Sequence, residues 1–156
     1  MTDVEKLLAI AEIKQLMARR CRCVDERDWE GYTACHTPNA VVETFRTLGR
    51  TDADLVGAQA ITDYTRKTLD GGDGRPRRTS VHHVHEPEIE FTSDTTAQGV
   101  WPMEDMLWWE EDGAPHWSHG YGHYHQSLEK IGGKWLISRR NLTRTRVDAG
   151  VGRGSV

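Results

Sequence analysis

The chain has 156 residues, with 20 basic and 24 acidic side chains, and carries a formal net charge of −4. This length suits one domain, and the slight acidic excess gives no indication of a nucleic-acid-binding surface. No apolar run approaches the ~20 residues that cross a bilayer, and residues 1–6 lack the pattern of a secretory signal. We therefore expect a cytoplasmic protein that binds neither nucleic acid nor membranes.

The first half of the chain has mostly helical periodicity. Apolar residues recur every three or four positions over 4–24 and predict one long amphipathic helix, with Asp25 at its end on the edge of the apolar stripe. Asp28 can cap a short second helix, which the segment 37–39 should stop. Residues 57–69 predict a third helix.

Three cysteines, at positions 21, 23 and 35, lie in this helical part. Their odd number and close clustering do not suit a disulfide framework, and the Cys-x-Cys spacing does not suit a zinc knuckle. We expect reduced thiols that pack in the interior.

The second half of the chain has the composition of β-strands. One short strand, over 40–45, should precede the third helix. The later runs, separated by turn signals such as Gly132-Gly133, cover 79–91, 95–111, 116–131 and 134–147. Helices followed by long strands indicate an α+β fold, with the helices on one face of a curved antiparallel sheet. A Gly- and Arg-rich loop (70–78) and the tail (149–156) are expected to be flexible, so a single domain should span 1–148.

Several segments resemble a known family. They are AEIKQLMARRCRCVDERDWEGYTACHTPNAVVE, LVGAQAITDYTRKTL and GYGHYHQSLEKIGGKWLISRRNLTRTRVD, with a histidine before a long strand between the last two. Over residues 5–148 this order resembles the SnoaL-like branch of the nuclear transport factor 2 superfamily. The resemblance implies a cone-shaped sheet wrapped around the N-terminal helix and enclosing a pocket. The superfamily includes dehydratases, isomerases, polyketide cyclases, a dehydrochlorinase and non-enzymes, so the fold does not decide the chemistry.

The segment SVHHVHEPEIEF, at 80–91, places three histidines in four positions. Because alternate side chains of a strand face opposite ways, His82 should lie on one face and His83 and His85 on the other. The resemblance implies a catalytic histidine at the position of His82, with His83 as the alternative, and a partner aspartate that Asp25 matches. Glu86 stands where the family commonly has an asparagine, which adds an acid or shifts the register.

A paired aspartate and histidine can carry out general acid–base chemistry. The Asp25 carboxylate against one imidazole nitrogen of His82 would raise the basicity of the other nitrogen. Such a pair can take a proton from carbon or deliver one to a leaving hydroxyl. The alternative interpretation is that Asp25 merely ends a helix and His82 merely forms a hydrogen bond at a strand edge.

Two further polar residues are candidates on the long strands. Asp105 is the acid on a face that is otherwise apolar, and the resemblance implies a catalytic aspartate near it; a one-residue error in register would transfer the role to Glu104. In the last strand, a bulge between Arg139 and Asn141 would turn Arg144 inward together with Leu142. There its guanidinium could hold a substrate oxygen, whereas Arg20 on the first helix is a weaker candidate.

The histidines of HGYGHYH, at 119–125, permit a different interpretation. His123 and His125 could bind zinc together with His83 and His85 if the two strands were neighbours. We favour instead a position on the outer face of the sheet, where these side chains would contact another subunit.

Together these patterns predict a cofactor-independent lyase of the dehydratase type, or an isomerase, that binds no metal and acts on a hydrophobic oxygenated substrate such as a steroid or polyketide. The catalytic candidates are Asp25, His82, Asp105 and Arg144. The predicted pocket lining is Trp29, Tyr32, Tyr64, Trp101, Met103 and Leu107. The alternative is a non-catalytic module of the same fold that binds a hydrophobic ligand or another protein. We expect a homodimer or homotrimer, with Trp108 and Trp109 in its interface.

Overall fold

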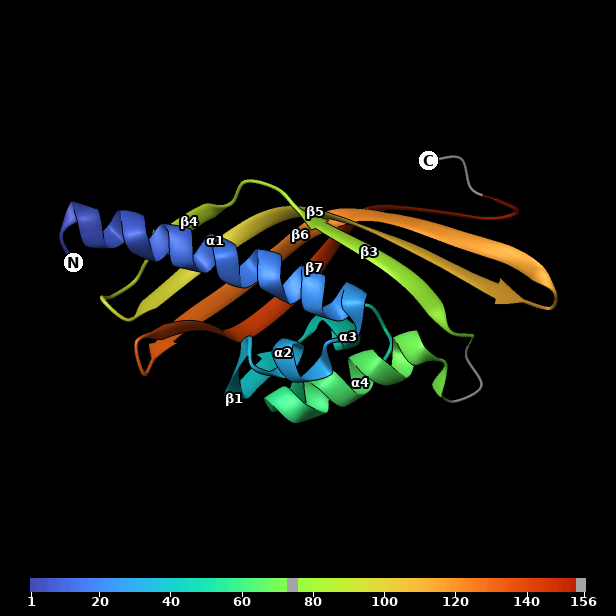
Figure 1. The fold of residues 1–156 in the computed structure, drawn as a ribbon, viewed down its shortest axis with the longest axis horizontal. Coiled ribbons are helices and arrows are strands. Elements are labelled where there is room, and N and C mark those ends of the chain that lie inside the picture. Colours follow the sequence, from blue (N-terminus) through green and yellow to red (C-terminus); the bar gives the residue numbers. More distant parts are fainter. Residues whose placement is uncertain (73–75, 154–156) are drawn as a thin grey trace.

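The computed structural model describes residues 1–72 and 76–153. Its helices are α1 (Asp3–Glu26), α2 (Trp29–Thr33), α3 (Thr44–Thr47) and α4 (Ala58–Asp70). Its strands are β1 (His36–Val42), β2 (Leu55–Val56), β3 (Arg78–Val84), β4 (Glu88–Phe91), β5 (Thr96–Glu111), β6 (Ala114–Ile131) and β7 (Lys134–Val151). Figure 1 shows α1 lying along the curved sheet, with α2, α3 and α4 gathered on the same side.

The strands form one open sheet in the order β2-β1-β7-β6-β5-β3, and β4 pairs with β5. The predicted α+β class is confirmed, with one correction to the sheet: β1 pairs with β7 in parallel, so the sheet is mixed. The parallel pair arises because β1 enters the sheet after two helices, whereas β5, β6 and β7 follow one another through tight turns.

Helix α1 forms where the sequence predicted it and holds the core together. Thr2 caps its first turn, in a capping box with Glu5. Its apolar side, which includes Ile13 and Met17, packs against inward-facing residues of the sheet such as Trp101. The helix ends at Arg27, which adopts the left-handed conformation (φ 64°), so Asp25 lies in the last turn. The three cysteines are free and buried, as predicted.

Three predicted boundaries are wrong for local reasons. Strand β1 begins at His36, and the segment 37–39 belongs to the strand; Pro38 lies where the register between β1 and β7 shifts, and there its missing N–H costs no ladder hydrogen bond. Residues 44–47 form α3 because Phe45 turns in to pack on Tyr64, with ring centroids 4.3 Å apart. The run 79–91 is split into β3 and β4 by the Pro87 region.

The end of β7 also differs from the prediction. The strand continues to Val151, which pairs with His116, so the first residues of the predicted tail belong to the sheet. The end of that tail (154–156) and the middle of the predicted loop (73–75) lie outside the described residues. Within the described part of the chain, no helix is both long and apolar enough to cross a membrane.

Candidate active site

A pocket opens between the inner face of the sheet and the helices. It has a volume of about 660 Å³, including its mouth, and every helix contributes to its lining. The C-terminal half of α1 supplies Arg20 and Val24, and the inward positions of β3 and β5 supply His82 and Asp105. Helix, strand and turn therefore converge on one cavity that holds both polar and apolar groups.

Asp25 and His82 meet beside this pocket. The Asp25 carboxylate accepts a hydrogen bond from His82 Nδ1 at 2.6 Å and another from the backbone N–H of His82 at 2.8 Å. Both side chains are largely buried. The strand alternation predicted from the sequence therefore holds: His82 faces inward, and His83 lies on the other face.

Asp25 is held by a further set of contacts from α1 and β3. Ser80 donates a hydrogen bond to Asp25 at 2.9 Å, and Arg27 Nη1 donates to the Ser80 hydroxyl at 3.0 Å. Arg27 also donates to Asp70 and to the backbone oxygen of Arg78, so it joins the end of α1 to α4 and β3. Burial acts to raise the pKa of the Asp25 carboxyl, but the hydrogen bonds and charge of His82 outweigh it and hold the pKa below its usual value.

Asp105 and Arg144 form a second polar pair in the pocket. Arg144 donates from both terminal nitrogens to the Asp105 carboxylate, at 3.0 and 2.5 Å. Gly120 lies opposite Asp105 on β6, and a Cβ there would stand 2.2 Å from Arg144 Nη1 and 2.5 Å from Asp105 Oδ1. The glycine therefore makes room for the ion pair.

A bulge turns Arg144 inward, as predicted, but it lies elsewhere. The register between β6 and β7 shifts between Ile137 and Arg139, two residues before the predicted position. Trp135, Ile137, Arg140 and Leu142 are consequently buried on the inner side of β7. A second shift, opposite Tyr121 and Gly122, follows Arg144.

Two buried arginines form the inner wall of the pocket. Arg20 lies over the rings of Tyr124 and Tyr32, at 4.8 and 5.6 Å from their centroids. Arg140 donates a hydrogen bond to the Tyr32 hydroxyl at 3.2 Å and lies 5.8 Å from the Tyr124 ring. Only 4% of Arg20 and 3% of Arg140 is exposed, and burial raises the pKa of the Tyr124 phenol.

Comparison with known proteins places this chain in a family. The family model of the SnoaL-like domain matches residues 5–141. The chain belongs to the SnoaL-like family. This agrees with the resemblance drawn from the sequence and with a long N-terminal helix against a curved, unclosed sheet.

Solved structures similar to this SnoaL-like protein share its fold over nearly the whole chain. One is a protein of Novosphingobium aromaticivorans DSM 12444, provisionally named a scytalone dehydratase (21% identity, 95% of this chain and 91% of that chain covered, TM-score 0.77). Another is hexachlorocyclohexane dehydrochlorinase LinA-type3 of Novosphingobium barchaimii LL02 (17%, 99% and 99%, 0.81). A third is a type 2 LinA dehydrochlorinase (16%, 99% and 97%, 0.81). At these identities the likeness shows the fold.

Of the six residues predicted to line the pocket of this SnoaL-like protein, two do so and four do not. Tyr32 and Leu107 line it. Trp101 and Met103 are core residues behind the lining, although Met103 Sδ lies 3.7 Å from Arg144 Nη1. The remaining two lie outside the lining as well: Trp29 borders a separate surface depression, and Tyr64 packs on Phe45 with its hydroxyl buried and without a hydrogen-bond partner.

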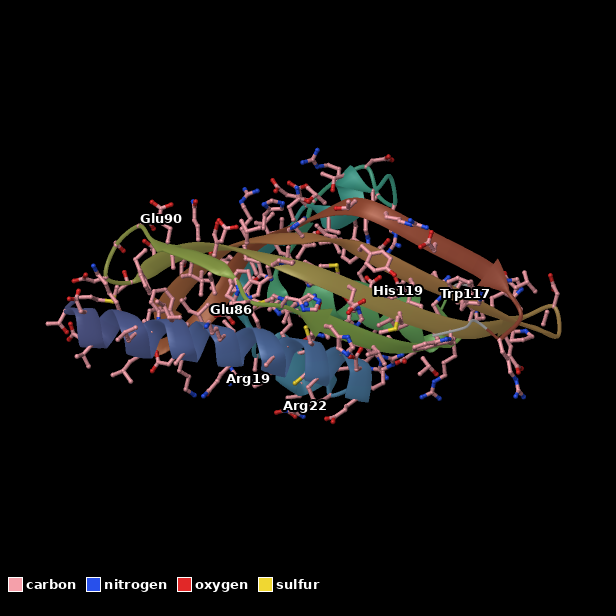
Figure 2. All side chains as sticks on the ribbon, turned by 90° about the horizontal axis from the view of Figure 1, so that it is seen from above. Arg19, Arg22, Glu86, Glu90, Trp117 and His119 are labelled. Carbon is pink, nitrogen blue, oxygen red and sulfur yellow. The ribbon has the colours of Figure 1, made fainter. Side chains whose placement is uncertain are left out.

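Three other histidines, His83, His85 and His119, lie on the outer face of the sheet around Glu104. His119 Nε2 donates to Glu104 at 2.7 Å, and the Tyr121 hydroxyl donates to His119 Nδ1 at 3.0 Å. His83 and His85 approach the same carboxylate at 3.4 and 3.7 Å. Figure 2 shows His119 and Trp117 on this face, turned away from α2 and α4.

The four histidines of the less favoured zinc interpretation are not brought together. Strand β5 lies between β3 and β6, so the pair His83 and His85 is not adjacent to the pair His123 and His125. The described residues contain no group of three or more histidine, cysteine or acidic side chains arranged to hold a metal. Trp108 and Trp109 point to opposite faces, and Trp109 stacks on His116 with centroids 5.6 Å apart.

Three residues that shape the site were not predicted from the sequence: Arg27, Gly120 and Arg140. A glycine inside a long strand is a signal for a close approach or bulge, so Gly120 could have been recognised. Arg140 could have been found if the bulge in the last strand had been placed two residues earlier, because Arg140 and Leu142 then face inward together. Arg27 carries no such signal, since its role depends on the left-handed turn that ends α1.

Proposed function

We propose that this SnoaL-like protein is a cofactor-independent lyase of the dehydratase type, acting on an oxygenated, largely apolar substrate such as a polyketide or steroid. The observation that carries the proposal is the 2.6 Å contact between Asp25 and His82 beside a pocket that also contains the bidentate ion pair of Arg144 with Asp105. Three of its structural neighbours are named a dehydratase or a dehydrochlorinase, and both names denote eliminations.

The reaction begins at His82. Its Nδ1 is engaged by Asp25, which leaves Nε2 to accept a proton from a carbon next to a carbonyl group. The electron pair of that C–H bond becomes an enolate, and the negative oxygen is stabilised by the Arg144 guanidinium, which Asp105 orients. The imidazolium that forms is stabilised by the Asp25 carboxylate.

The second step removes a hydroxyl group. The enolate electron pair forms a C=C bond as the C–O bond at the β carbon breaks, and the proton on His82 passes to the departing oxygen. Water leaves, and His82 returns to its neutral form. If the substrate has no leaving group, return of the same proton to another carbon gives an isomerisation.

Isotope exchange tests the first step without a known substrate. Purified protein is incubated in D₂O with a panel of β-hydroxy ketones, and both α-proton exchange and enone formation are followed by NMR. We expect both reactions with the wild type, and losses of about 10²- to 10⁴-fold in His82→Ala and Asp25→Asn. Equal rates in all three proteins would reject the pair; saturable binding without exchange would favour a ligand-binding module.

A further inference from the structure

Two arginines lie deep in the pocket, apart from the ion pair of Arg144 with Asp105. Arg20 and Arg140 lie at the inner wall, more than nine-tenths buried. Buried guanidinium groups normally pair with an anion, because taking an unpaired charge out of water is costly.

Arg20 and Arg140 have no such partner among the described residues. Arg20 Nε and Nη1 and Arg140 Nε are sealed from solvent without a hydrogen-bond acceptor. The two guanidinium groups contact the aromatic rings of Tyr32 and Tyr124 and the uncharged hydroxyls of the same two tyrosines, none of which is an anion. Two like charges are therefore held near one ring without neutralisation, which favours binding of an anion between them.

His36, whose ring packs against Tyr32, does not change the charge of this region. His36 Nδ1 donates to the Tyr32 backbone oxygen at 2.9 Å, so Nε2 carries its lone pair and has no partner. Burial, followed by the charge of Arg20, lowers the pKa of His36 to about 4. The imidazole is neutral at physiological pH, and the excess positive charge remains.

From these contacts we infer that Arg20 and Arg140 form a carboxylate-binding subsite, and that the substrate is an apolar organic acid. The inference rests on the proposed function for what happens at the other end of the molecule. Apolar side chains, Val24, Phe45, Leu69, Leu107 and Leu142, line the space beside the two arginines and suit the body of such a ligand. Guanidinium groups match the two oxygens of a carboxylate.

The sheet fixes an approximate length for this ligand. Gly120, opposite Asp105, and Tyr124, beneath the two arginines, are four residues apart on β6. At ~3.3 Å per residue their separation is on the order of 13 Å. An acid anchored at the inner wall would therefore present to His82 a carbon several bonds away from its carboxylate. A carboxylate directly attached to the reacting carbon does not fit this spacing.

Binding of a matched acid and amide tests the subsite. 2-Naphthoate and 2-naphthamide have the same shape and differ in charge, and titration calorimetry at low salt measures both. We expect the acid to bind about tenfold or more tightly than the amide, and Arg140→Gln and Arg20→Gln each to remove most of this preference. Arg22→Gln is the matched control, because Arg22 lies exposed on α1 (Figure 2) and should keep the preference.

Equal binding of acid and amide to the wild type would overturn the inference without any variant, so it is testable even if an arginine variant fails to fold. Tighter binding of 2-naphthyl phosphate than of the acid would overturn the carboxylate assignment. His82→Asn separates the two proposals: it should lose turnover but keep the preference for the acid. Turnover by the wild type without an acid preference would retain the proposed function and reject the subsite.

Discussion

A histidine pairs with a carboxylate on each face of the sheet formed by β3, β5 and β6, with α1 supplying the carboxylate on the inner face. On the inner face His82 contacts Asp25 at 2.6 Å, with 12% and 20% of the two side chains exposed. On the outer face His119 contacts Glu104 at 2.7 Å, with 25% and 24% exposed. The distance between the partners therefore does not separate the pair that we propose to be catalytic from the pair on the outer face.

Their surroundings do distinguish them. Asp25 is fixed by Ser80 and by the backbone of His82, and His82 lines a pocket. Glu104 is approached by two more histidines that are over half exposed, and the hydrogen bond from His119 is the main cause that lowers the pKa of its carboxyl. A second polar pair and a cavity accompany only the inner pair among the described residues. A histidine–carboxylate pair can act on a substrate only where a substrate can reach it, and His82 lines a pocket.

The largest difference between the two faces should appear when one histidine is removed from each. His82→Asn should lower the rate of α-proton exchange by about 10²- to 10⁴-fold, because the general base is lost. His119→Asn should leave the rate within about twofold. Exchange in D₂O with the same hydroxy ketone measures both variants.

Circular dichroism and thermal unfolding of both proteins serve as the control for folding. Similar losses of exchange rate in the two variants would contradict the assignment of catalysis to the inner face. Preserved exchange in His82→Asn would have the same consequence.

Much of this division between faces was predictable from strand periodicity. The alternation of side chains along 79–91 separated His82 from His83 and His85, and the apolar phase of 101–107 placed Asp105 inside. The end of the helical pattern located Asp25. These are local regularities with fixed periods, so one sequence suffices to find them.

The rest depended on contacts between distant elements. Trp101 has the inward phase of a pocket residue, but it is 1% exposed because α1 covers it. The polar sequence around Arg140 is typical of a solvated strand end, yet the bulge near Ser138 turns Arg140 inward. Whether an inward residue meets a neighbour or a cavity is decided by packing, which a single sequence pattern does not reveal.

Gly120→Ala should disturb the second inner pair and lower stability. The added Cβ would overlap Arg144 Nη1 and Asp105 Oδ1, so the ion pair must shift. We expect a loss of about 1–3 kcal/mol in the free energy of unfolding, measured by urea denaturation. In an Arg144→Gln background the same substitution should cost less, because the displaced group is absent. Equal costs in both backgrounds would show that the overlap with Arg144 is not the cause.

The buried His36 should make stability depend on pH. Its folded pKa, about 4, lies below the ordinary 6.5, so between these values the unfolded chain binds more protons. Stability therefore rises with pH over this window and is fully present above it. From pH 7 to pH 5 the free energy of unfolding should fall by about 2 kcal/mol through this group.

His36→Gln should remove most of that pH dependence, whereas His123→Gln on the exposed face should retain it. Asp25 also has a lowered pKa, but its contribution is lost only as the pH falls below the ordinary aspartate value of 3.8. Urea denaturation at pH 5, 6 and 7 separates the two groups. An unchanged slope in His36→Gln would reject His36 as its source.

The smallest expected effect belongs to the outer pair. Glu104→Gln removes the charge that His83, His85 and His119 share, and partly exposed ion pairs of this kind contribute about 0.2–1 kcal/mol. The loss in the free energy of unfolding should stay in this range and shrink in high salt, because mobile ions screen exposed charges. The exchange rate at His82 should not change. A drop of about tenfold or more in that rate, with the fold intact, would mean that Glu104 influences His82 through the neighbouring backbone of β3 and β5, and the two faces could no longer be treated as independent.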